Sequence, residues 1–207
     1  MFIGRNALNI GLQNILNIKG GNIKNFEITS GTITSGNTTG TVTLSNAVNE
    51  DNTLILGFHN LFKASSSYQY NATKWELTST TEITLTRDTA SATPPYDTIG
   101  NVDFFVIEFE DNIILSQQIA TFTVPLGGTA DSITDTISSV DTNYSFPISY
   151  GRMSTAAQSN GSSTAMPTGF NFSFNSSTEA QIDTRIDGSA NTHGRTEYVN
   201  IVEFVSV

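Results

Sequence analysis

The side chains that could support nucleophilic or general acid–base chemistry are few and scattered. The two histidines, His59 and His193, are expected at a strand end and in a loop, and neither stands beside a Gly-X-Ser-X-Gly nucleophile motif. The chain has no cysteine, which excludes a thiolate nucleophile and a cysteine-based zinc site. It also has no Gly-X-X-X-X-Gly-Lys-Ser/Thr phosphate-binding loop. The sequence therefore predicts a protein that is not an enzyme and uses no cofactor or metal.

Acidic residues form two groups that invite comparison with paired-carboxylate catalysis. These groups are Glu108, Glu110 and Asp111, and Asp131, Asp135 and Asp141. Glu108 and Glu110 are two residues apart on an expected strand, so they share a face and repel each other instead of flanking a substrate. Calcium binding is an alternative, although no Asp-X-Asp-X-Asp-Gly loop is present. We interpret both groups as solvated faces of an acidic protein.

Composition and charge exclude several function classes. A net charge of −10 repels the phosphates of nucleic acids and anionic lipids. No apolar run approaches the roughly 18 residues of a membrane-spanning helix. Asparagines interrupt any signal-peptide core near the start, which predicts synthesis in the cytoplasm without a signal peptide. Only 14% of the residues are charged, while 13 Phe and 6 Tyr indicate packed cores beneath an uncharged polar surface.

The elements that would position these side chains are predominantly short strands. Residues 81–87 and 170–174 alternate apolar and polar side chains, which is typical of strands with one buried face. Turn-forming residues gather at 92–101, 125–131, 156–169 and 187–194. We expect Trp75 to belong to a core. The segment 7–18 fits one face of a helix with Leu8, Leu12, Ile15 and Leu16, and fits a strand equally well with Leu8, Ile10 and Leu12.

An internal repeat is indicated by several anchors in the same order. Residues 41–58 resemble 135–151, and 79–85 resemble 176–182. The pattern Val-Ile-Glu-Phe that ends at Phe109 recurs as Ile-Val-Glu-Phe ending at Phe204. The alternative is that strands of β-sandwiches simply resemble one another. Residues 102–110 are apolar on both faces except at the acids, as in a central strand, so we expect Glu108 and Glu203 at a strand end, an edge or a subunit contact that keeps them hydrated.

The predicted fold is all-β. Two small antiparallel β-sandwich modules, of a jelly-roll or immunoglobulin-like kind, would follow an extended N-terminal arm. The expected boundaries are 1–40 for the arm, 41–125 for the first module and 130–207 for the second, with Pro125, Gly127 and Gly128 in the joint.

These short motifs resemble the small β modules of tailed-bacteriophage virion proteins. The resemblance rests on "ISSVD…SF…G" (137–151), "STE" (177–179) and "VEF" (202–204). Such modules occur in head decoration proteins, head fibres and tail appendages, commonly as homotrimers. The resemblance implies a structural protein on the virion exterior, and it carries no active-site residue to this chain. The polar loop at 151–169 departs from the pattern.

We therefore expect a capsid decoration or cement protein that stabilises the shell by contacts with itself and with the major capsid protein. The expected assembly contact consists of apolar residues of the arm: Phe2, Ile3, Leu8, Ile10, Leu12, Ile15 and Leu16. The alternatives are a tail or neck component, and a carbohydrate- or receptor-binding module. In that last case Tyr68 and Tyr70 would contact a surface glycan or a partner protein.

Overall fold

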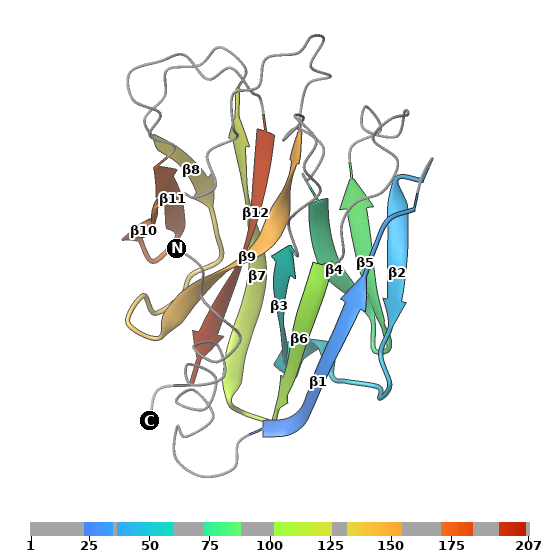
Figure 1. Cartoon of the computed structure of the whole chain (residues 1–207). Helices are drawn as coiled ribbons and strands as arrows, with labels where there is room; N and C mark the ends of the chain where they lie inside the picture. The colour runs from blue at the N-terminus through green and yellow to red at the C-terminus, as the bar shows by residue number, and fades with distance from the viewer. Residues whose placement is uncertain are drawn as a thin grey trace, which may run out of the picture.

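The computed structural model describes residues 23–34, 37–59, 73–87, 102–125, 132–154, 171–183 and 195–205. Within these residues the chain is all-β, with three antiparallel sheets and a single turn of 3-10 helix (Figure 1). The alternating patterns read from the sequence do form strands, and the all-β prediction is confirmed.

Six strands make up the first half of the chain. One sheet has the order β1-β6-β3 and a second group has the order β2-β5-β4. The strands are β1 (Ile23–Gly31), β2 (Thr39–Thr43), β3 (Thr53–His59), β4 (Thr73–Ser79), β5 (Glu82–Arg87) and β6 (Val102–Phe109), with the 3-10 turn η1 (Glu50–Asn52) before β3. Apolar side chains of both groups meet in a first core that includes Trp75, Leu85 and Phe104. The prediction that Trp75 is a core residue is confirmed.

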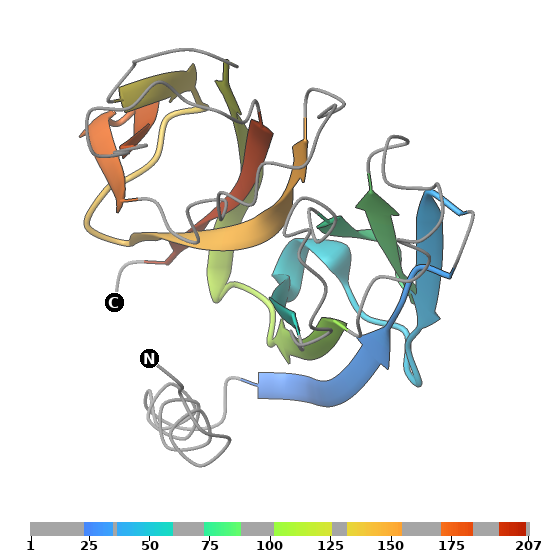
Figure 2. The same cartoon turned by 45° about the horizontal axis from the view of Figure 1, so that its top comes forward.

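The second half repeats this order of pairing. Strand β12 lies between β7 and β9, as β6 lies between β1 and β3, and β11 lies between β8 and β10, as β5 lies between β2 and β4. The strands are β7 (Ile114–Val124), β8 (Ser132–Thr136), β9 (Ser145–Ser154), β10 (Asn171–Ser176), β11 (Glu179–Asp183) and β12 (Arg195–Phe204). Figure 2 shows the two halves as two rounded groups of strands side by side.

A second core fills the space between β7-β12-β9 and β8-β11-β10. It contains Phe122, Ile182 and Ile201, with Phe172 and Phe174 of β10 packed against it. Residues at equivalent places in the two halves are buried alike: Leu85 of β5 and Ile182 of β11 are both fully buried in their cores. The two central strands are β6 and β12, which confirms the interpretation of their two-sided apolar composition.

The halves share one six-stranded sheet, β2-β5-β4-β9-β12-β7. The junction is between β4 and β9, where Lys74 lies opposite Gly151. Gly151 has a φ of +92°, and a Cβ there would lie 2.0 Å from the carbonyl oxygen of Thr73. Only glycine adopts this conformation and leaves room for the neighbouring strand. The junction therefore depends on the missing side chain at position 151.

A third core lies between the halves. Leu54, Ile107 and Phe109 of the first half pack with Ile114 and Val202 of the second. Beside it, the Gln117 amide donates hydrogen bonds to the carbonyl oxygens of Glu50, Asp51 and Thr53, at distances of 3.0–3.3 Å. The interface thus combines apolar burial with satisfied polar groups.

A buried tyrosine belongs to the same region. The Asn200 amide donates to the Tyr150 hydroxyl at 3.0 Å and to the Gln117 side-chain oxygen at 2.8 Å. Burial raises the pKa of Tyr150 to about 12, although the hydrogen bond from Asn200 opposes this shift. The hydroxyl is therefore neutral over the whole physiological range.

Strand pairing differs from the expected layout at two places. Residues 23–31, expected within the extended arm, form β1 and pair with the central strand β6. Strand β7, which falls within the expected bounds 41–125 of the first module, pairs with β12 in the second half. The residues that suggested a linker, Pro125, Gly127 and Gly128, lie in the connection between β7 and β8, which corresponds to the connection between β1 and β2.

Candidate functional site

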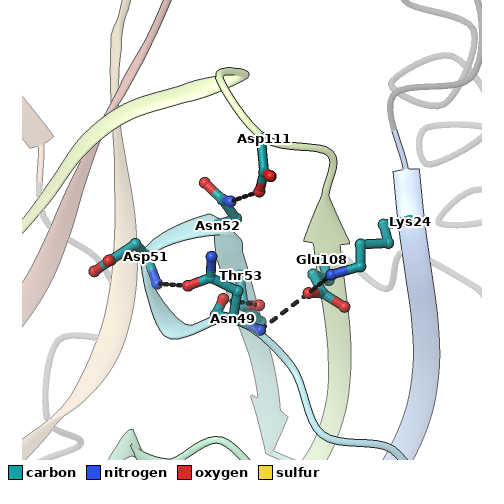
Figure 3. A network of polar contacts seen from close by, with 7 residues as sticks. All are labelled: Lys24, Asn49, Asp51, Asn52, Thr53, Glu108 and Asp111. Atoms are coloured by element: carbon teal, nitrogen blue, oxygen red, sulfur yellow. Dashed lines mark hydrogen bonds and ion pairs between the residues drawn. The ribbon is translucent and has the colours of Figure 1, made fainter.

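The first candidate acid, Glu108, lies at the end of β6 and is 2% exposed. Its Oε1 accepts hydrogen bonds from the backbone N–H of Asn49 at 3.0 Å and from Lys24 Nζ at 2.8 Å (Figure 3). Asn49 begins η1: its side chain accepts from the N–H of Asp51, and its carbonyl accepts from the Thr53 hydroxyl. We call Glu108 with Asn49 the first latch, because the carboxylate fixes the turn before β3 to β6.

The charge of Glu108 is stabilised in this environment. Burial alone would raise the pKa of Glu108, but the hydrogen bonds from Lys24 and Asn49 and the charge of Lys24 outweigh burial, so its pKa lies below the usual value. The same contact raises the pKa of Lys24. A carboxylate that stays ionised and has its oxygen occupied by two donors is unsuited to general acid catalysis at neutral pH.

Glu203 makes the equivalent contact in the second half. Its Oε1 accepts from the backbone N–H of Asp141 at 2.8 Å, and its Oε2 accepts from the Ser116 hydroxyl at 2.9 Å. Asp141 then accepts from the N–H of Asn143, and its carbonyl accepts from the Ser145 hydroxyl. Glu203 with Asp141, the second latch, therefore repeats the bond to the turn; the second donor differs, because Ser116 bonds to Oε2 of Glu203 whereas Lys24 bonds to Oε1 of Glu108.

The expectation that Glu108 and Glu203 stay hydrated is wrong. Both are buried, at 2% and 7% exposure. Buried carboxylates are tolerated when N–H and O–H donors replace water, and both latches supply such donors. The sequence did hold a signal for this arrangement, because an Asx residue stands four positions before a Thr or Ser in both turns, at Asn49 and Asp141.

The remaining acids also serve as acceptors within turns and between strands. Asp111 accepts from the Asn52 amide at 2.9 Å, and Asp135 accepts from the N–H of Thr121 at 2.7 Å. Glu110 is exposed. Across the described ranges, no three His, Asp or Glu side chains gather as metal ligands would. Asp111 and Asp135 therefore serve as hydrogen-bond acceptors that hold neighbouring segments together.

One charged pair was missed by the sequence analysis. Arg195 and Glu197, at the start of β12, are 1% and 2% exposed, and Arg195 Nε lies 2.7 Å from Glu197 Oε1. The two side chains are two residues apart on a strand and so project from the same face. No motif marks such a pair in the sequence, because its burial depends on how the surrounding strands pack.

Several predicted site residues lie outside the described residues. They are the expected assembly contact of the arm, Phe2, Ile3, Leu8, Ile10, Leu12, Ile15 and Leu16, together with Tyr68, Tyr70, Asp131 and His193. His59 is the last residue of β3, opposite Val102 of β6. The assembly and ligand contacts assigned to the arm and the two tyrosines remain predictions.

The strand registers give the molecule two different ends. At one end β1, β3 and β6 meet at Gly31, His59 and Val102, and β12 begins opposite the last residues of β7 and β9. Six connections lie at this end, and four of them, 60–72, 88–101, 155–170 and 184–194, have eleven residues or more; the other two are 32–38 and 125–131. At the other end short segments with hydrogen-bonded turns connect the strands: 44–52, 80–81, 110–113, 137–144 and 177–178.

Comparison with protein-family models, with curated proteins and with solved structures finds no match to this chain. In the portion of the chain that the structure describes, no helix has the length and apolar character needed to cross a membrane.

Proposed function

We propose that this chain is a non-enzymatic structural protein of a bacteriophage virion, of the capsid decoration or cement type. It is built from two tandem copies of one six-stranded β-sandwich, residues 23–109 and 114–205. The proposal rests first on the resemblance of the motifs in 137–204 to virion β modules. The repeated architecture adds to it.

The observation that carries the proposal is the repeated latch. Glu108 and Glu203 lie at equivalent places in the two halves, and each fixes a turn to a central strand. A chain that duplicates a framework and occupies its buried carboxylates with backbone donors is suited to holding a shape. The uncharged Ser-, Thr- and Asn-rich surface suits a protein that is packed at high local concentration and must remain soluble.

The two ends of the molecule suit this role. The arm precedes Ile23, which lies at the end with short turns, so apolar residues of the arm would anchor the protein to neighbouring subunits. The opposite end carries the longer polar connections and would face outward. Burying apolar area at about 25 cal/mol per Å² makes each contact modest, but many copies on one particle add up.

An add-back experiment tests this function. Particles that lack the protein are mixed with the purified chain, and bound protein is measured after sedimentation together with the temperature at which the particles release their DNA. We expect saturable loading and a higher release temperature. A chain without residues 1–18 should load poorly, because it lacks Phe2, Ile3 and the apolar residues up to Leu16. Full loading without these residues would refute the anchoring role, and no loading of the intact chain would refute the function.

A second function, glycan or receptor binding, is favoured by one observation. The longer connections converge on one end, and one of them, 60–72, contains Tyr68 and Tyr70 among Ser and Asn residues. Recognition loops commonly combine tyrosine with small polar residues, because tyrosine offers a large contact area at low entropic cost. The structural role and this binding role are compatible on one virion protein.

A glycan array separates the two functions. Under the binding hypothesis, the intact chain gives reproducible signals that disappear when Tyr68 and Tyr70 are both changed to Ala. The matched control is Tyr144→Ala, because Tyr144 is 39% exposed at the opposite end of the molecule. Equal loss with the control, or no signal from the intact chain, would count against glycan binding.

A further inference from the structure

The outer face of the sheet β1-β6-β3 carries apolar side chains in register. Phe26 lies opposite Ile107, and Ile28 lies opposite Phe105, which faces Leu56 on the other side. Phe105 makes ring contacts with Phe26 at 6.2 Å and with Phe58 at 5.6 Å between centroids. We call Phe26, Ile28, Phe58 and Phe105 the open face.

The second half of the chain covers only one corner of this sheet face. Ile107 and Leu54 are 2% and 6% exposed, because they pack into the core between the halves. Away from that corner, Ile28 is 61% exposed, and Phe26 and Phe58 are 42% and 41% exposed. The open face is therefore an apolar surface beside the interface, on and next to the edge strand β1.

The size of the open face suits a short segment better than a globular partner. The exposed parts of Phe26, Ile28 and Phe58, with the partly buried Phe105, leave an area on the order of a few hundred Å² at most. A stable protein–protein interface uses about 800 Å² from each partner. A single amphipathic segment of about ten residues would cover such an area. A second folded copy would need further contacts around it.

The chain itself holds such a segment directly before β1. Residues 1–22 include Leu8, Leu12, Ile15 and Leu16, which share one side if the segment is helical. A helix of nine residues would be about 13 Å long. Phe26 and Ile28 lie ~7 Å apart along the strand, so a helix of this length would cover both side chains. Gly20 and Gly21, just before Ile23, permit the chain to reverse over the strand.

Charge also favours this segment as the occupant. Residues 1–22 contain Arg5 and Lys19 and no acidic residue, so they carry a charge of +2. The rest of the chain carries a surplus of 12 acidic side chains. Attachment at Ile23 keeps the segment at an effective concentration in the millimolar range, which favours its own molecule over a neighbour.

We propose that residues 8–16 of the free protein dock on the open face of the same molecule, with Leu12 and Ile15 over Phe26 and Ile28. This use of the arm within one molecule differs from the contact between subunits expected for the same residues. It concerns the protein in solution and does not depend on the proposed virion function.

Disulfide trapping tests the docking directly, because the chain has no native cysteine. The full-length double variant Leu12→Cys with Ile28→Cys is oxidised, and the products are separated by mass without reduction. We expect a disulfide within one chain to form at least tenfold faster than in the control Leu12→Cys with Thr41→Cys. Thr41 is exposed on β2, a strand of the other sheet, and neither Ile28 nor Thr41 is needed for packing.

The disulfides that form show whether the arm docks on its own molecule. Disulfides between chains would overturn docking within one molecule, and would support exchange of arms as an assembly contact. Equal rates for the two variants would also overturn the proposal. As a second measurement, removal of residues 1–18 should raise the binding of a fluorescent apolar dye severalfold, and Ile28→Asp in the shortened chain should reverse the rise. An unchanged dye signal would contradict the docking.

Discussion

At the scale of single residues, Glu108 and Glu203 explain how two equivalent turns are held. Each glutamate lies at the end of a central strand and accepts a hydrogen bond from the backbone N–H of a turn. For Glu108 this turn leads into β3, and for Glu203 it leads into β9. A hydrogen bond to a charged group contributes about 1.5–3 kcal/mol, so each carboxylate stabilises its own half. Of the two, Glu108 belongs to one of the acidic groups that the sequence analysis compared with paired-carboxylate catalysis.

Replacing the latch carboxylates should destabilise both halves. Glu203→Leu keeps the volume but leaves the N–H of Asp141 without its acceptor, so we expect the free energy of unfolding to fall by about 1–3 kcal/mol. Glu203→Gln retains an acceptor oxygen and should cost less. Glu108→Leu should behave like Glu203→Leu in urea denaturation, and Glu110→Gln, at an exposed position, should be close to neutral. Neutral Leu variants would contradict the latch role.

The first latch also predicts a dependence of stability on pH. The pKa of Glu108 is lower in the folded protein than in the unfolded chain, where a glutamate titrates near about 4.3. Its contribution is therefore complete above that value and is lost as the pH falls through the folded pKa. When the free energy of unfolding is measured from pH 7 to pH 3, Glu108→Gln should lose less stability than the wild type does. Lys24→Gln should show a smaller change in the same direction. If both variants lose stability in parallel with the wild type, the first latch does not cause the pH dependence.

The sequence located these residues but not their surroundings. The shared Glu-Phe pattern marked Glu108 and Glu203 as equivalent, and hydrogen-bonding partners at equivalent places agree with that. Their burial could not be predicted, because it follows from turns at Asn49 and Asp141 that lie about 60 residues away in sequence. The buried pair of Arg195 and Glu197 was missed for the same reason.

At the scale of elements, alternation predicted strands but not their partners. Strand β1 was missed because residues 23–31 have apolar side chains on the exposed face and polar ones toward the first core, where Glu27 accepts from the N–H of Ser45. Strand β7 was placed in the first module because Pro125, Gly127 and Gly128 mark a connection without saying which strands it joins. Pairing depends on contacts between distant segments.

Gly151 gives a prediction at this scale. In Gly151→Ala the new Cβ would meet the carbonyl oxygen of Thr73, and the backbone would keep an unfavourable positive φ. We expect the junction of β4 and β9 to open or shift, with a loss of at least about 2 kcal/mol in the free energy of unfolding. Thermal denaturation compares this variant with Thr41→Ala, at an exposed position of β2. Similar melting temperatures for the two variants would show that the junction does not need glycine.

At the scale of the whole molecule, the halves are joined by a shared sheet, an apolar core and the hydrogen bonds of Gln117. We therefore expect the chain to unfold in one cooperative step. Trp75 is the only tryptophan and lies in the first core, so its fluorescence reports the first half, while circular dichroism reports both. The two signals should give coincident urea transitions. A fluorescence transition separated from the circular dichroism transition would mean that the halves fold independently.

Electron cryo-microscopy of particles loaded with the chain would show whether the protein is a structural component on the outside of a virion, as proposed. We expect density for two side-by-side β-sandwiches at repeated positions on the outer surface. The short-turn end that contains Ile23 should face the shell, and the end with the longer connections should face outward. Particles without such density, under conditions where the chain is present in excess, would contradict it.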